Sequence, residues 1–196
     1  MVDAAHKLEV RDTDHMYLDL PKQDERLRGW LNSCFESGRW TSNAVSITQN
    51  WLKQGLQPRP ITRDLKWGTP VPMDRFKDKV FYVWFDAPIG YVSMTSCYLQ
   101  DRGLPADEWK KWWQNPDKVR LVQFMGKDNV PFHTVVFPGS LLATEKKWTL
   151  VGDLSVTEYL QYESGRFSKT KGVGVFGDTA KDTGIPSEVW RFYLLS

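Results

Sequence analysis

The spacing of apolar residues predicts helices in the first part of the chain. The segment KQDERLRGWLNSCFES at 22–37 repeats apolar side chains at intervals of three and four residues, namely Leu27, Trp30, Leu31, Cys34 and Phe35. That period is typical of an amphipathic helix. Ser42 is placed to cap a second helix, which should end near Gly55. We therefore expect residues up to about 55 to be mainly helical.

A stretch without periodicity follows these helices. QPRPITRDLKWGTPVP contains several prolines and an Arg-Asp pair, and neither a helical nor a strand pattern runs through it. Such a composition predicts a long functional loop or a junction between domains. We place a domain boundary there, between residues 60 and 61.

Beyond the loop, short apolar runs of β type alternate with helical ones. KVFYVWFD and VRLVQFMG read as strands, while PIGYVSMTSCYLQ, DEWKKWWQ and VPFHTVVFPGSLLA read as helices. This alternation predicts an α/β fold with a parallel sheet and crossover helices. Pro88 and Pro131 stand where helices would begin, so VWFDAP and FMGKDNVP should lie at strand tips. Ligands of such sheets bind beyond those tips, which makes them the expected site.

The last part of the chain is predicted to hold one more strand and two more helices. The strand WTLVGDLSV leads to the basic loop GRFSKTKG, which a short helix near GDTAKD and a helix opening at Pro186 follow. Gly172, Gly174 and Gly177 spell the dinucleotide pattern GxGxxG. That pattern requires a preceding strand. Because a charged loop precedes it here, we reject the oxidoreductase interpretation.

Charge and cysteine content exclude several classes of partner. The 26 basic and 24 acidic residues give a net charge of +2, too balanced for binding driven mainly by counterion release from nucleic acid. Cys34 and Cys97 form no CxxC pair or His/Cys cluster, so we expect two buried thiols, no zinc site and a reducing compartment. The first residues, MVDAAHKLEVRDTD, contain no apolar h-region and no run reaches membrane length, so we expect neither a secretory leader nor a membrane span. A cytoplasmic protein without a membrane partner is expected.

Three stretches carry residues suited to chemistry, although each also has an ordinary structural explanation. The loop FSKTKG brings hydroxyls and ammonium groups together, which suits polyphosphate, yet a solvated surface loop has the same composition. GKDNVPFH offers a glycine for close approach and a carboxylate for ribose or amine, or else a helix cap and a core histidine. VWFDAPIGY forms either an aromatic concavity or plain core.

The order VWFDAPIGY, GKDNVPFH, FSKTKG resembles the class I aminoacyl-tRNA synthetases, and within them the methionyl branch. The resemblance extends over nearly the whole chain, from MYLDL to GDTAKDTGIPSEVWRFYLL. It implies that residues 61–196 are the second half of a Rossmann-like catalytic domain, truncated at its end. It also implies that residues 1–60 are the helical tail of the connective domain inserted in that fold.

The resemblance assigns roles to two groups of site residues. Its GxDxxxxH motif falls on Gly126, Asp128 and His133, of which the first two, with Lys169, would bind ATP. Its KMSKS loop is matched from Arg166 to Thr170, with Arg for the first Lys and Thr for the last Ser. The implied catalytic group is Arg63, Arg166, Ser168, Lys169 and Thr170, with Lys169 holding pyrophosphate oxygens.

The WFDAPIGY stretch is the most specific part of the resemblance, because the methionyl branch uses it for the methionine pocket. The implied pocket residues are Trp84, Ala87, Pro88, Tyr91, Asn129 and His133, although some branches have an apolar residue at the position of Asn129. A polarizable thioether packs well against aromatic edges, which Trp84 and His133 provide. We expect the Tyr91 hydroxyl to donate a hydrogen bond to the sulfur.

The reaction that the resemblance implies is activation of methionine by ATP with Mg²⁺, followed by transfer to initiator and elongator methionine tRNA. Association with other synthetases or accessory proteins is not readable from these residues. The first-half signature HxGH is missing, because His6, His15 and His133 form no such pair. We therefore expect the chain alone to be inactive and the reaction to need a longer protein. The alternative is a non-catalytic binding module that keeps the methionine pocket.

Overall fold

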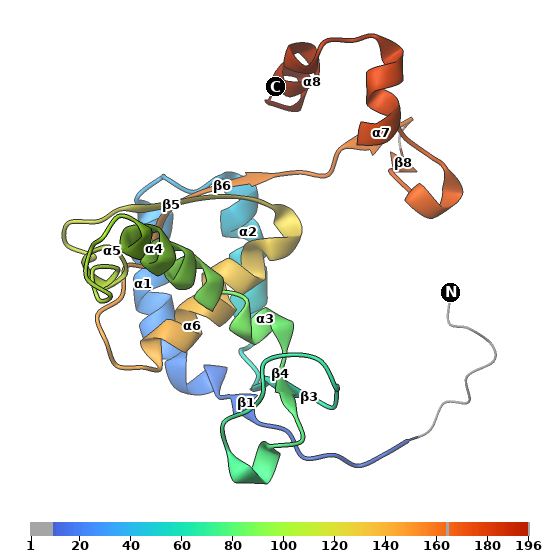
Figure 1. The fold of residues 1–196 in the computed structure, drawn as a ribbon. Coiled ribbons are helices and arrows are strands. Elements are labelled where there is room, and N and C mark those ends of the chain that lie inside the picture. Colours follow the sequence, from blue (N-terminus) through green and yellow to red (C-terminus); the bar gives the residue numbers. More distant parts are fainter. Residues whose placement is uncertain (1–9, 164, 196) are drawn as a thin grey trace. The chain divides into compact units, whose positions relative to one another are not determined.

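The computed structural model describes residues 10–163 and 165–195, which form two compact units (Figure 1). The first unit ends at Val156 and the second begins at Thr157. No division between compact units occurs near residue 60. The boundary expected at 60/61 is drawn between domains that the family resemblance implies, and not between compact units. It stays a prediction. His6 lies outside the described residues.

Both helices predicted at the start of the chain are present. A 3-10 turn (Leu20–Gln23) leads into α1 (Asp24–Glu36), and α2 spans Ser42–Lys53. The residue that precedes α2 is Thr41, so Ser42 is the first helical residue instead of the cap. The Thr41 hydroxyl accepts a hydrogen bond from the backbone N–H of Val156 at 3.2 Å, which ties the start of α2 to a distant strand.

The stretch expected to be a loop contains short strands that pair with residues far along the chain. β1 (Tyr17–Leu18) pairs antiparallel with β2 (Arg59–Pro60), and β3 (Thr62–Arg63) pairs antiparallel with β4 (Val80–Phe81). A 3-10 turn at Asp74–Phe76 precedes β4. Because each strand has two residues, no period-2 pattern could reveal them in the sequence.

The predicted strand tip at VWFDAP is wrong. The extended run ends at Phe81, and Val83–Asp86 form the short helix α3. The backbone N–H of Ala87 donates to the carbonyl oxygen of Val83 at 2.9 Å, a helical pairing. β4 has a short partner strand, so the following residues satisfy their backbone groups locally. The next helix, α4 (Ile89–Asp101), begins directly after Pro88 as predicted.

The predicted strand–helix–strand unit is confirmed around β5 (Leu121–Gly126) and β6 (Val151–Thr157). The two strands form a parallel pair, which Trp40 extends through a parallel bridge to Leu154. Helix α5 (Lys110–Trp113) precedes β5. The crossover consists of a 3-10 turn (Lys127–Asn129), a π-helical turn (Phe132–Val136) and α6 (Phe137–Leu142).

The π-helical turn has a local cause in the sequence. Pro138 lacks an N–H, and its ring would clash with the carbonyl of residue 134 in a regular α-helix. The turn widens just before this proline, and the N–H of Phe137 donates to the carbonyl of Phe132. Such turns are frequent at functional sites because they change the direction of the side chains that they carry. Here the turn carries His133.

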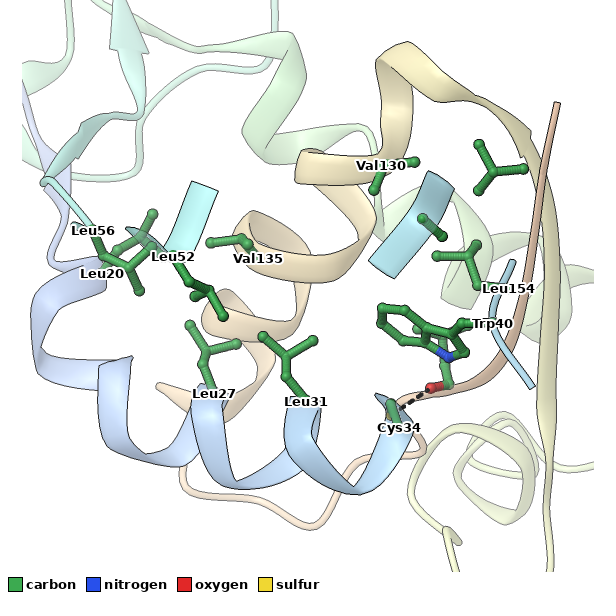
Figure 2. Close-up of a cluster of buried hydrophobic side chains, with 13 residues drawn as sticks. Leu20, Leu27, Leu31, Cys34, Trp40, Leu52, Leu56, Val130, Val135 and Leu154 are labelled. Carbon is green, nitrogen blue, oxygen red and sulfur yellow. Dashed lines mark hydrogen bonds between the residues drawn. The ribbon is translucent and has the colours of Figure 1, made fainter. Parts of the chain in front are cut away.

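The main core of the first unit joins helices from the start of the chain to the strand–helix–strand unit (Figure 2). Its buried members include Leu27 and Leu31 of α1, Leu52 of α2, Val135 of the π turn and Leu154 of β6. A second cluster consists of Val92, Trp113, Phe137 and Leu141. The π turn contributes Val135 to the first cluster and α4 contributes Val92 to the second, so both elements are packed into the core.

The two cysteines differ in environment, so the expectation of two buried thiols is wrong for one of them. Cys34 is buried, and its thiol donates to the carbonyl of Val151 at 3.7 Å. Burial raises the pKa of the Cys34 thiol to about 11. Cys97 is exposed on α4, because that helix turns Val92 and Leu99 inward instead.

The second unit is built from short elements around the basic loop. β7 (Gln161–Tyr162) pairs antiparallel with β8 (Gly165–Arg166), and a 3-10 turn spans Lys169–Lys171. The two predicted helices are confirmed as α7 (Gly177–Ala180), extended by a 3-10 turn at Lys181–Thr183, and α8 (Ser187–Leu195). Within the described part of the chain, no helix is long and apolar enough to cross a membrane.

Candidate functional site

His133 is the most sheltered polar side chain of the expected site, with 6% of its surface exposed. Its Nδ1 atom lies 2.9 Å from the carbonyl oxygen of Asn129, and its Nε2 atom lies 2.8 Å from the Tyr91 hydroxyl. A carbonyl oxygen only accepts hydrogen bonds, so Nδ1 carries the proton. In a neutral imidazole Nε2 is then an acceptor, and the Tyr91 hydroxyl donates to it.

The electrostatics of the pocket favour this neutral tautomer. Burial lowers the pKa of His133, and the hydrogen bond to the Asn129 carbonyl opposes that shift only in part. At neutral pH the imidazole is therefore uncharged. Its two hydrogen bonds fix the plane of the ring.

The expected donation from Tyr91 to a thioether sulfur does not fit this network. The single proton of the Tyr91 hydroxyl is directed at His133, so the oxygen presents its lone pairs to any ligand. Toward a ligand Tyr91 is thus an acceptor. Donation to sulfur would require His133 to release that hydrogen bond.

Aromatic packing holds Tyr91 in place. Its ring stacks on Trp113 with centroids 6.2 Å apart and lies 6.0 Å from the ring of Phe137. The indole N–H of Trp113 donates to the Thr95 hydroxyl at 2.9 Å, and that hydroxyl donates to the Tyr91 carbonyl at 2.9 Å. Both contacts come from residues that the sequence did not mark as part of the site.

Four predicted residues line one cavity, which we call the histidine cavity. This hollow of about 460 Å³ is lined by Tyr91, Gly126, Asn129 and His133, together with Val122, Gln123, Phe124 and Met125 of β5. Its position at the end of β5 agrees with the expectation that GKDNVPFH follows a strand tip. The structure therefore brings together residues from α4 and from the β5 crossover.

Three other predicted residues line a separate hollow, the arginine cavity. This cavity of about 360 Å³ has Arg63, Trp84 and Asp128 in its wall. The Arg63 guanidinium lies over the ring of Tyr82, with 3.6 Å from its central carbon to the ring centroid. Trp84 remains 45% exposed, which leaves much of its indole open to solvent or to a ligand.

A row of aromatic rings links the two cavities. Trp84 meets Phe132 edge to face at 5.3 Å, Phe132 meets His133 at 5.2 Å, and His133 meets Tyr91 at 5.8 Å. Phe132 is a further residue that sequence reasoning missed. The only signal was its position beside His133 in PFH.

The predicted grouping into methionine and ATP residues does not coincide with the cavities. Trp84, expected at methionine, shares a cavity with Asp128, expected at ATP, while Gly126 shares one with Tyr91. Ala87 and Pro88 line neither cavity. They lie at the junction of α3 and α4, where Ala87 ends one helix and Pro88 begins the other.

The remaining predicted residues lie together in the second unit. The hydroxyls of Ser168 and Thr170 are 3.4 Å apart, and Lys169 lies between them at the start of the 3-10 turn. The Arg166 guanidinium lies over the Tyr159 ring at 5.2 Å. The loop is closed by paired backbone hydrogen bonds between Ser168 and Val173. Among the described residues of both units, no group of three or more His, Cys, Asp or Glu side chains could hold a metal ion.

Comparison with known sequences gives a match along almost the entire chain. The family described as tRNA synthetases class I (M) matches residues 2–196. The cytoplasmic methionine–tRNA ligase of Xenopus laevis is 61% identical over 186 residues, which is 95% of this chain and 20% of that protein. Its Saccharomyces cerevisiae counterpart is 58% identical over 188 residues, which is 96% of this chain and 24% of that protein. The chain thus spans about a fifth to a quarter of these relatives.

Solved structures resemble the fold at lower sequence identity. The crystal structure of Mycobacterium tuberculosis methionyl-tRNA synthetase bound by methionyl-adenylate aligns with a TM-score of 0.62 and 23% identity. The alignment covers 90% of this chain and 32% of that one. At this identity the likeness concerns the fold.

Proposed function

This chain belongs to the class I tRNA synthetases, in the family described as tRNA synthetases class I (M). From that premise we propose that it functions as part of a methionine–tRNA ligase. The reaction begins with attack of the methionine carboxylate on the α-phosphate of ATP. A new carboxyl oxygen–phosphorus bond forms, the bond to pyrophosphate breaks, and methionyl-adenylate results. The methionyl group then passes to the 3′ end of tRNA.

The observation that carries this proposal is the Tyr91–His133–Asn129 network in the histidine cavity. These residues come from WFDAPIGY and GKDNVPFH, and they form a hydrogen-bonded group with one buried, neutral histidine. A neutral, ring-lined hollow suits a thioether, since each sulfur–aromatic contact contributes about 0.3–1.5 kcal/mol. A charged side chain would lose hydration there without gaining an opposite charge.

In this proposal the methionine side chain lies against the row of rings from Trp84 to Tyr91, with Asn129 at its edge. Ala87 and Pro88 act indirectly, because they set the angle between α3 and α4 and so the separation of Trp84 and Tyr91. The relative from Mycobacterium tuberculosis binds methionyl-adenylate. That complex supports a pocket for amino acid and nucleotide together.

ATP would enter as its Mg²⁺ complex, with the ion bound mainly by phosphate oxygens and water. Gly126 allows the nucleoside to approach the backbone, and Asp128 accepts from its hydroxyls. Lys169 and Arg166 stabilise charge that develops on pyrophosphate, while Ser168 and Thr170 order their loop. Arg63 would meet an anionic group of the activated substrate.

Transfer RNA of the initiator and elongator methionine types is the proposed second substrate, and the cytoplasm is the proposed compartment. The names of the relatives, which are cytoplasmic methionine–tRNA ligases, support a methionine tRNA and this compartment. The initiator and elongator types are what the family resemblance implies. The net charge of +2 fits local contact with RNA better than broad phosphate binding.

A chimera tests the function, with this chain in place of the matching segment of the Saccharomyces cerevisiae relative. We expect methionine-dependent exchange of pyrophosphate into ATP. Trp84→Ala should raise the KM for methionine at least about tenfold, or about 1.4 kcal/mol, and change the KM for ATP much less. Lys169→Ala should lower turnover by about 10²-fold.

The matched control is Trp112→Ala, which removes a 52%-exposed indole on α5 outside both cavities. It should leave both constants unchanged. A folded chimera that binds methionine without any exchange would favour a non-catalytic module instead. If Trp84→Ala raised the KM for methionine and the KM for ATP equally, Trp84 would not belong to the methionine pocket.

A further inference from the structure

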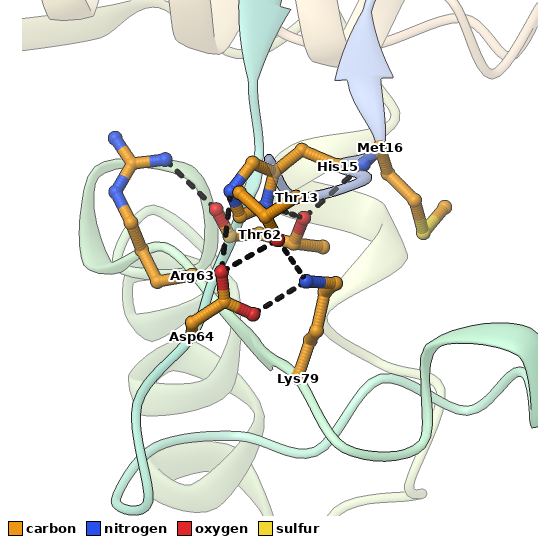
Figure 3. Close-up of polar contacts among 7 residues, drawn as sticks. All are labelled: Thr13, His15, Met16, Thr62, Arg63, Asp64 and Lys79. Atoms are coloured by element: carbon orange, nitrogen blue, oxygen red, sulfur yellow. Dashed lines mark hydrogen bonds and ion pairs between the residues drawn. The ribbon is translucent and has the colours of Figure 1, made fainter. Parts of the chain in front are cut away.

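A group of polar side chains gathers around Thr62 of β3 and the following Asp64; we call it the β3 cluster (Figure 3). Its members are Thr13, His15, Thr62, Asp64 and Lys79. The Thr13 hydroxyl donates to Asp64 at 2.7 Å, and the Lys79 ammonium donates to Thr13 at 2.8 Å and to the Asp64 carboxylate. The cluster therefore joins three segments that are far apart in sequence.

Thr62 forms the buried end of the cluster. Its side chain has no exposed surface, and its hydroxyl accepts from the backbone N–H of Met16 at 3.1 Å and lies 2.9 Å from Nδ1 of His15. Nε2 of the same histidine lies 3.7 Å from the Asp64 carboxylate. Thr62 and Asp64 are thus both held by the segment that precedes β1.

Arg63 stands between these two held residues and points the other way. Successive side chains of an extended strand project to opposite faces, so fixing Thr62 and Asp64 fixes the direction of Arg63. In Figure 3 the Arg63 guanidinium extends away from Asp64 and Lys79. It lines the arginine cavity and also a neighbouring hollow of about 730 Å³.

Two contacts orient the Arg63 guanidinium and leave most of its N–H donors available. One N–H, at Nη1, donates to the Thr62 carbonyl at 2.8 Å, and the planar group stacks on Tyr82. A guanidinium has five N–H donors in a fixed fork, which matches the oxygens of a phosphate or carboxylate. Donors therefore remain for an anionic ligand in the cavity.

In the Lys79–Asp64 pair the lysine is sheltered, whereas the Asp64 side chain is 53% exposed. The Lys79 side chain is 13% exposed, so its ammonium depends on Asp64 and Thr13 to replace water. Hydrogen bonds from Lys79 and Thr13 hold the pKa of Asp64 below its usual value. Removing the ammonium would leave the carboxylate beside β3 without its main partner.

We propose that Lys79 and Asp64 are positioning residues for Arg63, holding β3 so that the guanidinium meets an anionic oxygen of the substrate during adenylate formation. The inference rests on the proposed function. Lys79 touches no cavity that Arg63 lines, so its effect on the reaction passes through β3. Because the contact is with developing charge, turnover should suffer more than methionine binding.

Lys79→Met in the same chimera tests this, since it keeps the length of the side chain and removes the charge. We expect exchange turnover to fall about tenfold while the KM for methionine changes less than about twofold. Lys79→Arg, which retains the donor, should restore most of the turnover. Lys77→Met removes an exposed lysine two residues away and should have no effect.

A double-mutant cycle separates positioning from general stability. In an Arg63→Ala background, Lys79→Met should cause little further loss, because the group that it positions is already absent. An equal loss in both backgrounds would overturn the inference, as would normal turnover in Arg63→Ala. Asp64→Asn, which is nearly isosteric, repeats the cycle if Lys79→Met fails to fold. An unsubstituted chimera without exchange would reject the proposed function itself.

Discussion

The imidazole of His133 has a partner at each nitrogen and little contact with water. Folding therefore places a neutral histidine where the unfolded chain has a hydrated one that protonates readily. Burial lowers the pKa of the folded state below the unfolded value of 6.5. The unfolded chain therefore binds the proton more tightly than the folded chain does. As the pH falls below 6.5, protonation of this histidine favours unfolding.

The stabilising effect of a neutral His133 should be fully present above pH 6.5 and should disappear as the pH falls toward the lowered folded-state pKa. Its contribution to the slope is at most about 1.4 kcal/mol per pH unit. Urea unfolding of the chain between neutral pH and pH 5 measures it. His133→Gln should lose that part of the slope, while His15 remains in both proteins. Identical slopes in the two would contradict the assignment.

At the scale of elements, the GxGxxG stretch shows glycines that serve backbone conformation instead of a dinucleotide. Gly172 ends the 3-10 turn with a φ of 66°, and Gly174 has a φ of 120°. A β-carbon on Gly174 would come within 2.2 Å of the Phe167 ring. Close packing and a left-handed backbone therefore account for these two glycines.

Gly174→Ala should open the basic loop, because backbone strain and overpacking each cost about 1–3 kcal/mol. The expected result is faster hydrogen exchange at the Ser168 and Val173 amides, which close the loop. Gly177→Ala is the matched control, since a β-carbon there meets nothing within 4 Å. Unchanged protection in Gly174→Ala would mean that the loop does not depend on this contact.

On the scale of the whole molecule, the main core joins the N-terminal helices to the crossover that carries His133. Leu27 of α1 is fully buried, and a β-carbon on Gly139 of α6 would come within 3.5 Å of it. α1 thus approaches α6 closely. The site is held by residues from both sides of the predicted boundary at residue 60.

Leu27→Ala should lower the free energy of unfolding of the first unit by about 2–5 kcal/mol, the usual cost of a cavity in a packed core. Urea unfolding followed by tryptophan fluorescence measures this. Leu65→Ala removes a 60%-exposed leucine and should change stability by less than about 0.5 kcal/mol. Similar losses in both variants would contradict the core described for α1.

The sequence by itself determined the elements whose signal is local and repeated. Helix α1 follows from apolar periodicity, and α2 follows from a start signal near Ser42 and a stop signal at Gly55. Strands β5 and β6 follow from short apolar runs on either side of a helical one. The motif order was also enough to indicate the family. Such features depend on neighbours a few residues apart, which a single sequence displays.

Only the tertiary structure decided how the site residues meet. The hydrogen bond from Tyr91 to His133 spans 42 positions, and the contact from Lys79 to Thr13 spans 66. The sequence pattern favoured a strand at Val83–Asp86, but short pairing at β4 left those residues to form a helix. The two cavities, the tautomer of His133 and the direction of Arg63 all depend on contacts between distant segments. Local sequence patterns carry no record of such contacts.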